Sequence, residues 1–436
     1  MARYAAPGAQ GSVVSYRDRY DHFIGGEYVP PAGGGYFADR TPVTGEVFTE
    51  VARGTAEDLD RALDAAHGAA RRWGRTSVAE RANVLNEIAD RIEDDLEALA
   101  VAETWENGKP VREALATDLP RAVDHFRHFA GVVRTQEGGI SRIGEDLVAH
   151  HFPEPIGVVG QVVPWHRPLL TAAAGLAPAL AAGNTVVLKP AEQTPASIHV
   201  LVGLIADLLP PGVVNVVNGL TNGTSETGRH PHVFLADVAA HRDAFYDKAL
   251  RGFSTFALGQ ALVQSPVHDR FLVDVTERAA AVRPGHPLDT ATAVGALTTR
   301  EQVDGFTAQV ETAERQGARV VCGGERVDLG GELSGGYYVT PTVIEGRRCP
   351  DQADVGGPVV WLTRFDDVDD AVKAANETAR GVGAGVWSRD TAVADRVARR
   401  INARRVWLNT FRSDVGNRAA IDHYQQVKTI LVESPW

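Results

Sequence analysis

Two side chains of opposite charge, Lys189 and Glu192, follow a short apolar run at residues 184–188. The run predicts a β-strand. Thr194 and Pro195 predict the start of the next helix, because threonine is a good N-cap and proline suits the first helical position. In an open α/β sheet, ligands bind beyond the carboxyl ends of the strands. The lysine and the glutamate are therefore expected to line a ligand site, with an ion pair inside the loop as the alternative interpretation.

The elements around these residues form a βαβαβ pattern. Strands are predicted at 158–163, 184–188 and 213–217, and helices at 168–182 and from Thr194 onward. Short β-branched runs between longer amphipathic helices indicate parallel strands joined by right-handed crossovers. The loop Pro164, Trp165 and His166 follows the first of these strands.

The rest of the chain reads as further helices and strands. The first 30 or so residues are expected to form an extended arm, and capping boxes at 55–58 and 77–80 predict two helices, the second ending near Gly108. A β-arm is predicted at 139–148. The later segments are helices at 301–316, 368–379 and 391–401, and strands at 319–322, 382–387 and 405–409.

Composition limits the class of protein. A chain of 436 residues, 44% apolar and 23% charged, is an ordinary globular composition and long enough for about two or three domains. Its formal charge of −12 argues against a nucleic-acid surface. No apolar run approaches the roughly 18 residues of a membrane span, so no membrane partner is expected. Two cysteines and no export signal favour the cytoplasm.

Several segments resemble the aldehyde dehydrogenase superfamily. They are Glu154-Pro-Ile-Gly-Val-Val-Gly160 and residues 176–184, 189–195 and 210–219, and the likeness is strongest to bacterial NAD-dependent acetaldehyde dehydrogenases. The resemblance implies an α/β fold with a doubly wound Rossmann-type cofactor domain, a second α/β domain and an oligomerisation arm, shortened by internal deletions.

The resemblance also implies domain boundaries. The N-terminal helices and the cofactor domain would span 1–137 and 153–232, shortened after 219. The catalytic-type domain would span 233–420, and the oligomerisation arm 138–152 and 421–436. The phosphate-side αβ unit missing after 219 is expected to expose apolar sheet and to lower stability.

Aldehyde oxidation in this family requires a cysteine thiolate as nucleophile, an asparagine amide for the oxyanion and a glutamate as base. In this chain, residues 256–260 run directly into 261–271, which resembles the sequence beyond the cysteine. The cysteine loop is therefore expected to be absent. Leu262 and Ser265 are the nearest side chains, and Ser265 before Pro266 is interpreted as a loop or helix-start serine.

The other two catalytic positions are altered. The family's Pro-Trp-Asn is Pro164-Trp165-His166 here, so His166 stands where the amide donor is expected. An imidazole can donate a hydrogen bond or carry a proton, and drift without a role is the alternative. Glu226 is the base in one alignment of residues 223–229 and a solvated loop residue in the other.

The resemblance implies NAD as the cofactor, at a site that is weakened or lost. Pro164, Trp165, Lys189 and Glu192 match positions at the adenosine end. Asp354 replaces a glutamate that holds the nicotinamide ribose, and its side chain is one methylene shorter. Residues 412–418 replace an anchor loop, which is expected to widen the substrate mouth.

Other chemically capable residues favour structural interpretations. Cys322 lies in a predicted strand as a small apolar residue, and Cys349 follows Arg347 and Arg348 in a loop. The histidine pairs at 150–151 and 230–232 lack a third ligand at suitable spacing, so no metal site is expected.

These residues predict an aldehyde-dehydrogenase-like protein that cannot use the standard thiohemiacetal route. It would persist as a structural or regulatory partner, as a homo-oligomer or with an intact paralogue. The alternative is an NAD(P)-dependent oxidoreductase that acts on an aldehyde through an altered site with His166. A decaying gene without a selected function is the third interpretation.

Overall fold

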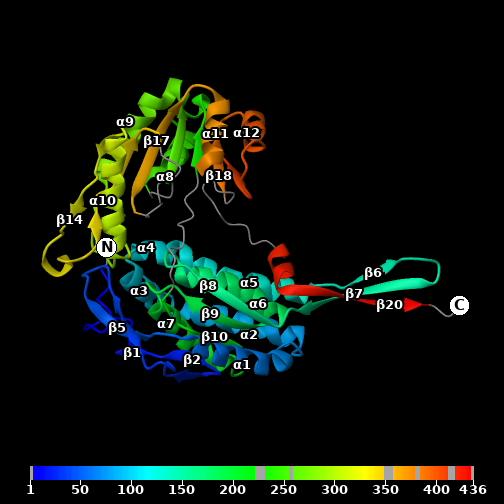
Figure 1. Cartoon of the computed structure of the whole chain (residues 1–436). Coiled ribbons are helices and arrows are strands. Elements are labelled where there is room, and N and C mark those ends of the chain that lie inside the picture. The colour runs from blue at the N-terminus through cyan, green and yellow to red at the C-terminus, as the bar shows by residue number, and fades with distance from the viewer. Residues whose placement is uncertain are drawn as a thin grey trace.

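The computed structural model describes residues 3–220, 231–254, 259–347, 357–378, 383–410 and 418–433. The chain forms two α/β lobes and a β-arm that projects from the first lobe (Figure 1). The helices are α1 (Ala56–Trp73), α2 (Val78–Asp94), α3 (Leu96–Asn107), α4 (Val111–Glu113), a π-helix (Ala114–Asp118), α5 (Leu119–Arg134), α6 (Pro168–Ala182), α7 (Ala196–Ile205), α8 (Ala244–Ser254), α9 (Ser265–Ala281), α10 (Arg300–Arg315), α11 (Val368–Thr378) and α12 (Thr391–Ala398). The strands are β1 (Arg19–Tyr20), β2 (His22–Ile24), β3 (Glu27–Val29), β4 (Tyr36–Arg40), β5 (Val47–Ala52), β6 (Gly139–Arg142), β7 (Leu147–Pro155), β8 (Val158–Val163), β9 (Thr185–Pro190), β10 (Val214–Val216), β11 (Pro231–Phe234), β12 (Gln260–Gln264), β13 (Arg319–Cys322), β14 (Arg326–Val327), β15 (Tyr338–Val339), β16 (Thr342–Glu345), β17 (Val359–Phe365), β18 (Ala384–Trp387), β19 (Val406–Leu408) and β20 (Gln425–Glu433).

The first lobe is built on a five-stranded sheet of order β3-β2-β10-β9-β8. Strands β8, β9 and β10 are parallel and are joined by α6 and α7, as the βαβαβ pattern predicts. Helices cover both faces. Val187 of β9 packs with Ala62 and Ala66 of α1, whereas its neighbours Val186 and Leu188 belong to the cluster that contains α6 and α7. The Rossmann-type, doubly wound arrangement is confirmed.

The open edge of this sheet is β8. Among the described residues, β8 pairs with β9 on one side and with no strand on the other. Val162 is 72% exposed there. The sheet therefore ends where the missing αβ unit was expected to continue it.

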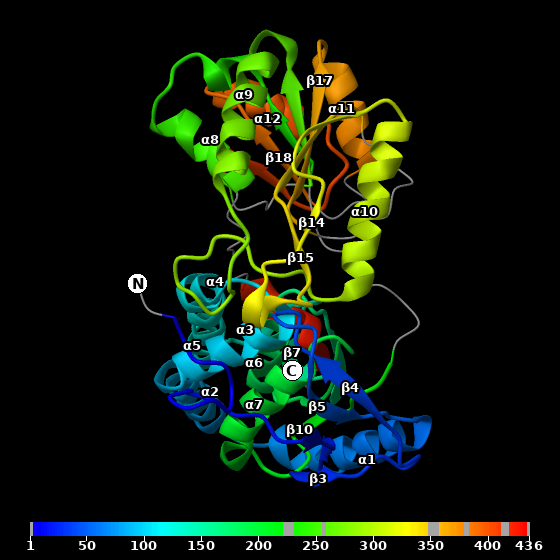
Figure 2. The same cartoon turned by 90° about the vertical axis from the view of Figure 1, so that its left-hand side faces the viewer.

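The second lobe is a seven-stranded sheet of order β13-β16-β17-β12-β11-β18-β19. Its strand pairs are parallel except for β13 with β16. Adjacent residues of β12 again serve opposite faces, since Val263 packs in one apolar cluster and Leu262 in another. Figure 2 shows the two lobes one above the other, with α10 extending toward the first lobe.

The arm is a three-stranded antiparallel sheet of order β20-β7-β6. β20 pairs along its whole length with β7, from Gln425 opposite Pro155 to Glu433 opposite Leu147. The C-terminal segment is thereby tied to the connection that enters β8. The β-arm predicted at 139–148 is present, and its second strand β7 continues to Pro155.

Three predictions about local structure were wrong. The first 30 residues are not only an extended arm, because β2 adds to the cofactor sheet through Phe23 opposite Val216. The helix expected to run to Gly108 divides at Asp95 into α2 and α3. Thr194 does not cap α7; Pro195 occupies the N-cap and α7 begins at Ala196.

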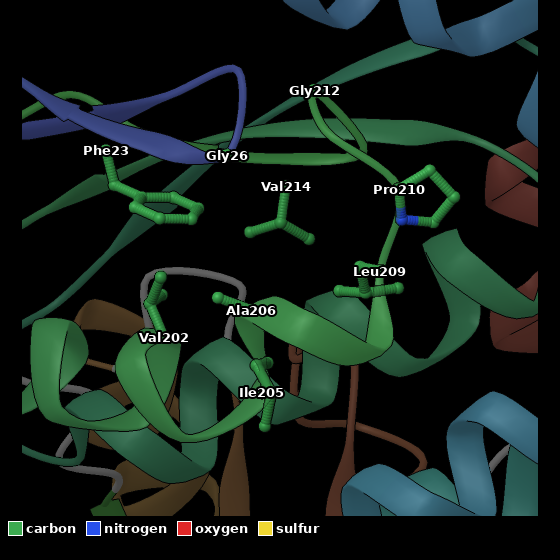
Figure 3. Close-up of a pocket in the computed structure, with 9 residues that line it drawn as sticks. All are labelled: Phe23, Gly26, Val202, Ile205, Ala206, Leu209, Pro210, Gly212 and Val214. Atoms are coloured by element: carbon green, nitrogen blue, oxygen red, sulfur yellow. The ribbon is translucent and has the colours of Figure 1, made fainter.

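A small apolar gap separates α7 from the edge of the N-terminal strands (Figure 3). Its volume of about 10 Å³ holds no more than a single water, and no polar side chain lines it. It is a packing gap. Its lining residues are Phe23, Gly26, Val202, Ile205, Ala206, Leu209, Pro210, Gly212 and Val214.

Candidate cofactor and active site

Two loops meet at the carboxyl edge of the first sheet. In the parallel pair β8 and β9, Val162 lies opposite Lys189 and Val163 opposite Pro190. The loop that follows β8 carries Pro164, Trp165 and His166, and the loop that follows β9 carries Glu192. Strand register thus brings together five residues that the sequence predicted for one site.

Lys189 is half-buried, and its Nζ donates to the Pro190 carbonyl at 3.1 Å. Burial lowers the pKa of Lys189, and the nearby Glu192 carboxylate opposes this effect. Gln193 Nε2 donates to Glu192 Oε1 at 3.3 Å. The lysine and glutamate are therefore electrostatically coupled, as a ribose-binding pair or a loop ion pair requires.

Glu192 and Gln193 line a polar cavity of about 460 Å³ between the lobes. Side chains from β4 and from the start of α10 close it on the other sides. The remaining lining residues are Ala38, Asp39, Arg40, Gly45, Thr298, Thr299, Arg300, Glu301 and Tyr337. The cavity is large enough for a small polar ligand. It lies beside Glu192, one of the residues predicted to bind the adenosine end of the cofactor.

Trp165 and His166 stand edge to face, with ring centroids 5.9 Å apart. His166 is exposed to solvent, yet protein around one side of the ring, followed by the charges of Arg167 and Lys109, lowers its pKa to about 4. The imidazole is therefore neutral near pH 7 and can donate from one nitrogen and accept at the other. The pKa agrees with the donor role proposed for His166 and does not distinguish it from drift.

Beneath this loop lies a charged network that the sequence analysis missed. Lys109 Nζ donates to Asp118 Oδ2 at 2.5 Å and also to Glu103. Glu103 Oε2 accepts the backbone N–H of Leu169 at 3.2 Å, and Arg167 Nε lies 3.7 Å from Asp118. The network holds the start of α6 against α3 and the π-helix.

A signal for this network exists in the sequence. Helix α3 is apolar overall and yet buries Glu103, Thr104, Glu106 and Asn107. Buried carboxylates need partners, so two glutamates in an otherwise apolar helix indicate a polar network. The π-helix that carries Asp118 is of a kind often found at functional sites.

The cysteine of the family was expected after the segment 256–260. Strand β12 begins at Gln260 and is followed directly by α9 at Ser265, and residues 256–271 contain no cysteine. Ser265 is the first residue of α9, and its Oγ donates to the Phe365 carbonyl at 3.0 Å. The interpretation of Ser265 as a helix-start serine is confirmed.

The remaining candidates divide into described and undescribed residues. Cys322 is half-buried in β13, and burial raises the pKa of its thiol. Glu226, Asp354 and Cys349 lie outside the described residues, so their predicted roles stay predictions.

Histidine does not form a metal site in the described part of the chain. The ring of His151 hydrogen-bonds to Thr429 and Ser141, and His232 accepts from Trp387 Nε1 at 3.2 Å. No group of three histidine, cysteine or carboxylate side chains there is placed to hold a metal.

The described ranges contain no helix with the length and apolarity needed to span a membrane.

Comparison with known proteins gives the family. The family model described as the aldehyde dehydrogenase family matches residues 28–238 and 239–420. The fluoroacetaldehyde dehydrogenase of Streptantibioticus cattleyicolor is 52% identical over 497 residues, covering 99% of this chain and 98% of the relative. Acetaldehyde dehydrogenase 2 of Cupriavidus necator is 49% identical over 482 residues, covering 96% and 95%.

Solved structures of aldehyde dehydrogenases have a fold similar to that of this chain. An indole-3-acetaldehyde dehydrogenase of P. syringae, a cysteine-to-alanine mutant in complex with NAD+ and IAA, matches with a TM-score of 0.87. The identity is 27%, and the match covers 96% of this chain and 97% of that chain. The alignment with the S. cattleyicolor enzyme is longer than the 436 residues of this chain, so the relative has internal positions without a counterpart here. The chain belongs to the aldehyde dehydrogenase family.

Proposed function

We propose that this chain does not oxidise aldehydes through a cysteine thiohemiacetal and serves as a structural or regulatory partner in an oligomer. One observation carries the proposal. Residues 256–260 run directly into residues 261–271 without a cysteine, at the point in the sequence where the family resemblance puts the nucleophile. Cys322 does not replace it, because it lies on a distant strand with a raised thiol pKa.

The cofactor geometry supports the proposal. A doubly wound sheet binds its dinucleotide at the switch point between the first strand and the strand on its other side. In the described residues β8 is the first strand of the unit and has no such neighbour. Lys189 and Glu192 fit the ribose of the adenosine half, and the pyrophosphate half has no counterpart among them. We infer that NAD binding is weakened or lost.

The arm supports an oligomeric role. Its strands expose large apolar side chains that a monomer would leave in water. They include Ile140, Ile143, Phe152, Val427, Ile430, Leu431 and Val432. The partner that we propose is a second copy of this chain or an intact paralogue.

The first test is turnover. Purified chain with acetaldehyde and NAD+ is expected to form no NADH above background, while the C. necator acetaldehyde dehydrogenase serves as the active control. Steady NADH formation by this chain would overturn the proposal.

The second test is binding. Titration calorimetry and thermal shift with NAD+ are expected to show little response, whereas a ligand at about 100 times its Kd stabilises a protein by about 2.7 kcal/mol. A full response together with turnover would favour the alternative, an NAD(P)-dependent oxidoreductase with His166 in an altered site. The neutral imidazole of His166, on the loop that follows β8, is the observation behind that alternative.

The third test is assembly. The chain is mixed with an intact paralogue from the same organism and separated by size-exclusion chromatography. A shared peak, or a homo-oligomer peak for the chain alone, is expected. Monomer peaks for both proteins at micromolar concentration would contradict the oligomeric role.

A further inference from the structure

Asn218 is the residue at which the chain leaves β10, and other segments hold each of its polar groups. Its backbone N–H donates to His22 Nδ1 at 3.1 Å, and its carbonyl accepts the N–H of Gly54 at 3.0 Å. Its side-chain amide lies 2.9 Å from His199 Nε2 and donates to the Asp21 carbonyl at 3.4 Å. A side chain at position 54 would overlap the Asn218 carbonyl oxygen, so the two backbones are in direct contact. Strand β2, the segment before α1 and helix α7 therefore fix the exit of β10 together.

This exit lies on the edge of the sheet that carries the candidate cofactor site. Strands β9 and β10 are parallel, with Leu188 opposite Val216, so the chain leaves both strands on the same side. Lys189 and Glu192 lie at that end of β9, and Asn218 follows β10. Ligands of an open α/β sheet bind along this edge. The contacts of Asn218 therefore help to shape the edge, whether or not the chain oxidises aldehydes.

His22 holds the N–H of Asn218 only as a neutral ring. A backbone N–H is always a donor, so the accepting Nδ1 carries no proton, and the proton of the neutral imidazole is on Nε2. Nε2 lies 3.6 Å from Asp58 Oδ2, and both side chains are fully buried. A second proton would occupy Nδ1 and turn this acceptor into a donor. The hydrogen bond to Asn218 would then be lost.

His199 is a second buried imidazole in contact with Asn218. It is 1% exposed and stacks on Tyr20, with ring centroids 5.0 Å apart. On another side lies the ring of Tyr28, and the Arg17 guanidinium stands 4.2 Å from the centroid of that ring. The other nitrogen of His199, Nδ1, has no hydrogen-bond partner in the described part of the chain, so no carboxylate there contacts it. A proton on this ring would therefore be a buried cation without a partner, which is costly.

We propose that His22 and His199 act as an acid-sensitive latch on Asn218, which holds the exit of β10 while both rings are neutral and releases it when they bind protons. Release would free the backbone of Asn218 and the N–H of Gly54 together, because the two are bonded to each other. The latch thus makes the shape of the carboxyl edge of the first sheet depend on pH.

The charged groups around His22 act in opposite directions. Burial lowers the pKa of His22, and Arg61 adds to this effect, whereas Asp58 and Asp21 oppose it. The Asp58 carboxylate is already in use, since its Oδ2 accepts the backbone N–H of Thr55 at 2.9 Å. The latch therefore stays closed at neutral pH although a carboxylate lies beside the ring.

Burial is also the largest effect on His199, and it lowers the pKa of this ring to about 4. His22 and Arg17 act in the same direction, and the hydrogen bond with Asn218 opposes them. Histidines in an unfolded chain titrate near about pH 6.5, so below that pH the closed latch binds fewer protons than the open one. The contribution of the latch to stability is therefore complete above about pH 6.5 and is lost as the pH falls through the lowered folded-state pKa values.

The direct test is hydrogen exchange of the unmodified protein, measured by mass spectrometry from neutral pH into mild acid. After correction for the intrinsic pH dependence of exchange, protection of peptides that cover 214–220 is expected to fall below about pH 6.5, by about tenfold per pH unit for each histidine that binds a proton on opening. Peptides from α2, which contains no histidine, are the internal reference and should keep their protection. Constant protection of 214–220, or an equal loss in α2, would overturn the proposal.

Substitutions of the two rings give an independent test. His22→Asn places an amide oxygen at the same distance along the side chain as Nδ1, so it can accept from Asn218 and cannot bind a proton. His199→Gln likewise keeps a polar atom at the position of Nε2 without a titratable ring. Each variant is expected to make the loss of protection in acid shallower by about tenfold per pH unit.

Two controls separate the latch from a simple loss of a ring. The amide of His22→Gln lies further out, toward Asp58, so the N–H of Asn218 loses its acceptor and the protection of 214–220 should be low at every pH. His67→Gln, at an exposed position on α1, is the matched control and should keep the native profile. A native pH profile in both His22→Asn and His199→Gln would contradict the latch.

Discussion

Single buried charges in this protein hold backbone groups of distant segments. Glu103 and Glu106 lie one turn apart on α3, and each accepts backbone N–H groups from another helix. Glu103 holds the start of α6, and Glu106 holds the start of α7. One helix thereby positions both loops of the candidate site, which is the reason α3 carries buried glutamates.

Lys109 balances the charge of this arrangement. We expect Lys109→Met to lower the free energy of unfolding by about 3–5 kcal/mol, since it leaves Glu103 buried without a cation and Asp118 with only Arg167, 3.7 Å away. Denaturant melts would measure the change. The matched control is Lys428→Met, whose ion pair with Glu154 is exposed and should cost no more than about 1 kcal/mol. Equal losses in the two variants would contradict the network.

The imidazole of His166 should titrate in acid. Its pKa is lowered to about 4, so the folded state binds fewer protons than the unfolded chain between about pH 6.5 and pH 4, and stability declines as the pH falls through that window. Proton NMR of the ring measures the titration. Arg167→Gln removes one of the cations and should move the midpoint upward, while Arg134→Gln, far along the sequence on α5, should not. A native midpoint near 6.5 would show that the ring is not perturbed.

At the scale of elements, strand β8 is the feature that separates this chain from a complete doubly wound sheet. It is apolar, uncharged and free of proline, and in the described structure its outer edge has no partner strand. Natural proteins usually protect such edges, because an open edge recruits other strands. At this edge the side chain of Val162 is exposed, whereas that of its neighbour Val163 is buried.

A charged residue on the open edge of β8 is expected to reduce association between copies of the protein. Val162→Lys is expected to reduce concentration-dependent light scattering and to change the free energy of unfolding by no more than about 0.5 kcal/mol, because Val162 is 72% exposed. Val163→Lys is the contrast. Val163 is 1% exposed, and an unpaired buried charge there should prevent stable folding. If solutions of the Val162→Lys variant scatter light as strongly as those of the native protein, the copies do not associate through this edge.

Local prediction succeeded where one segment contains its own signals. The strand at 158–163, the helix at 168–182 and the strand at 319–322 were located to the residue. The start of α7 was misplaced because its cap comes from Glu106, far away in the sequence. Thr194 looked like a cap by local rules, and a tertiary contact replaced it.

At the scale of the whole molecule, the arm gathers many of the exposed large apolar side chains among the described residues. Figure 1 shows β6, β7 and β20 extending away from both lobes. β20 is exposed along almost its whole length, and it has a partner only in β7 among the described strands. An exposed apolar surface of this kind indicates association with another protein surface.

Charges on the arm should therefore separate the subunits. The double substitution Val427→Glu and Leu431→Glu is expected to convert the oligomer to monomer, as measured by size-exclusion chromatography with light scattering. Val427 is 68% and Leu431 58% exposed, so the fold of the monomer should be little affected. Val13→Glu, at an exposed apolar position outside the arm, is the control and should leave the oligomer intact. Persistence of the oligomer in the double variant would place the interface elsewhere.

The sequence by itself determined the family, the α/β alternation and the identity of the loop residues that follow β8 and β9. Those features reside in residue types and in periodicity along the chain. Only the tertiary structure decided that β8 is an edge among the described strands, that Lys109, Asp118 and Arg167 lie beneath His166, and that Glu106 caps α7. These contacts join residues far apart in sequence, and their energies depend on burial and on the proximity of charges. Local patterns carry neither quantity.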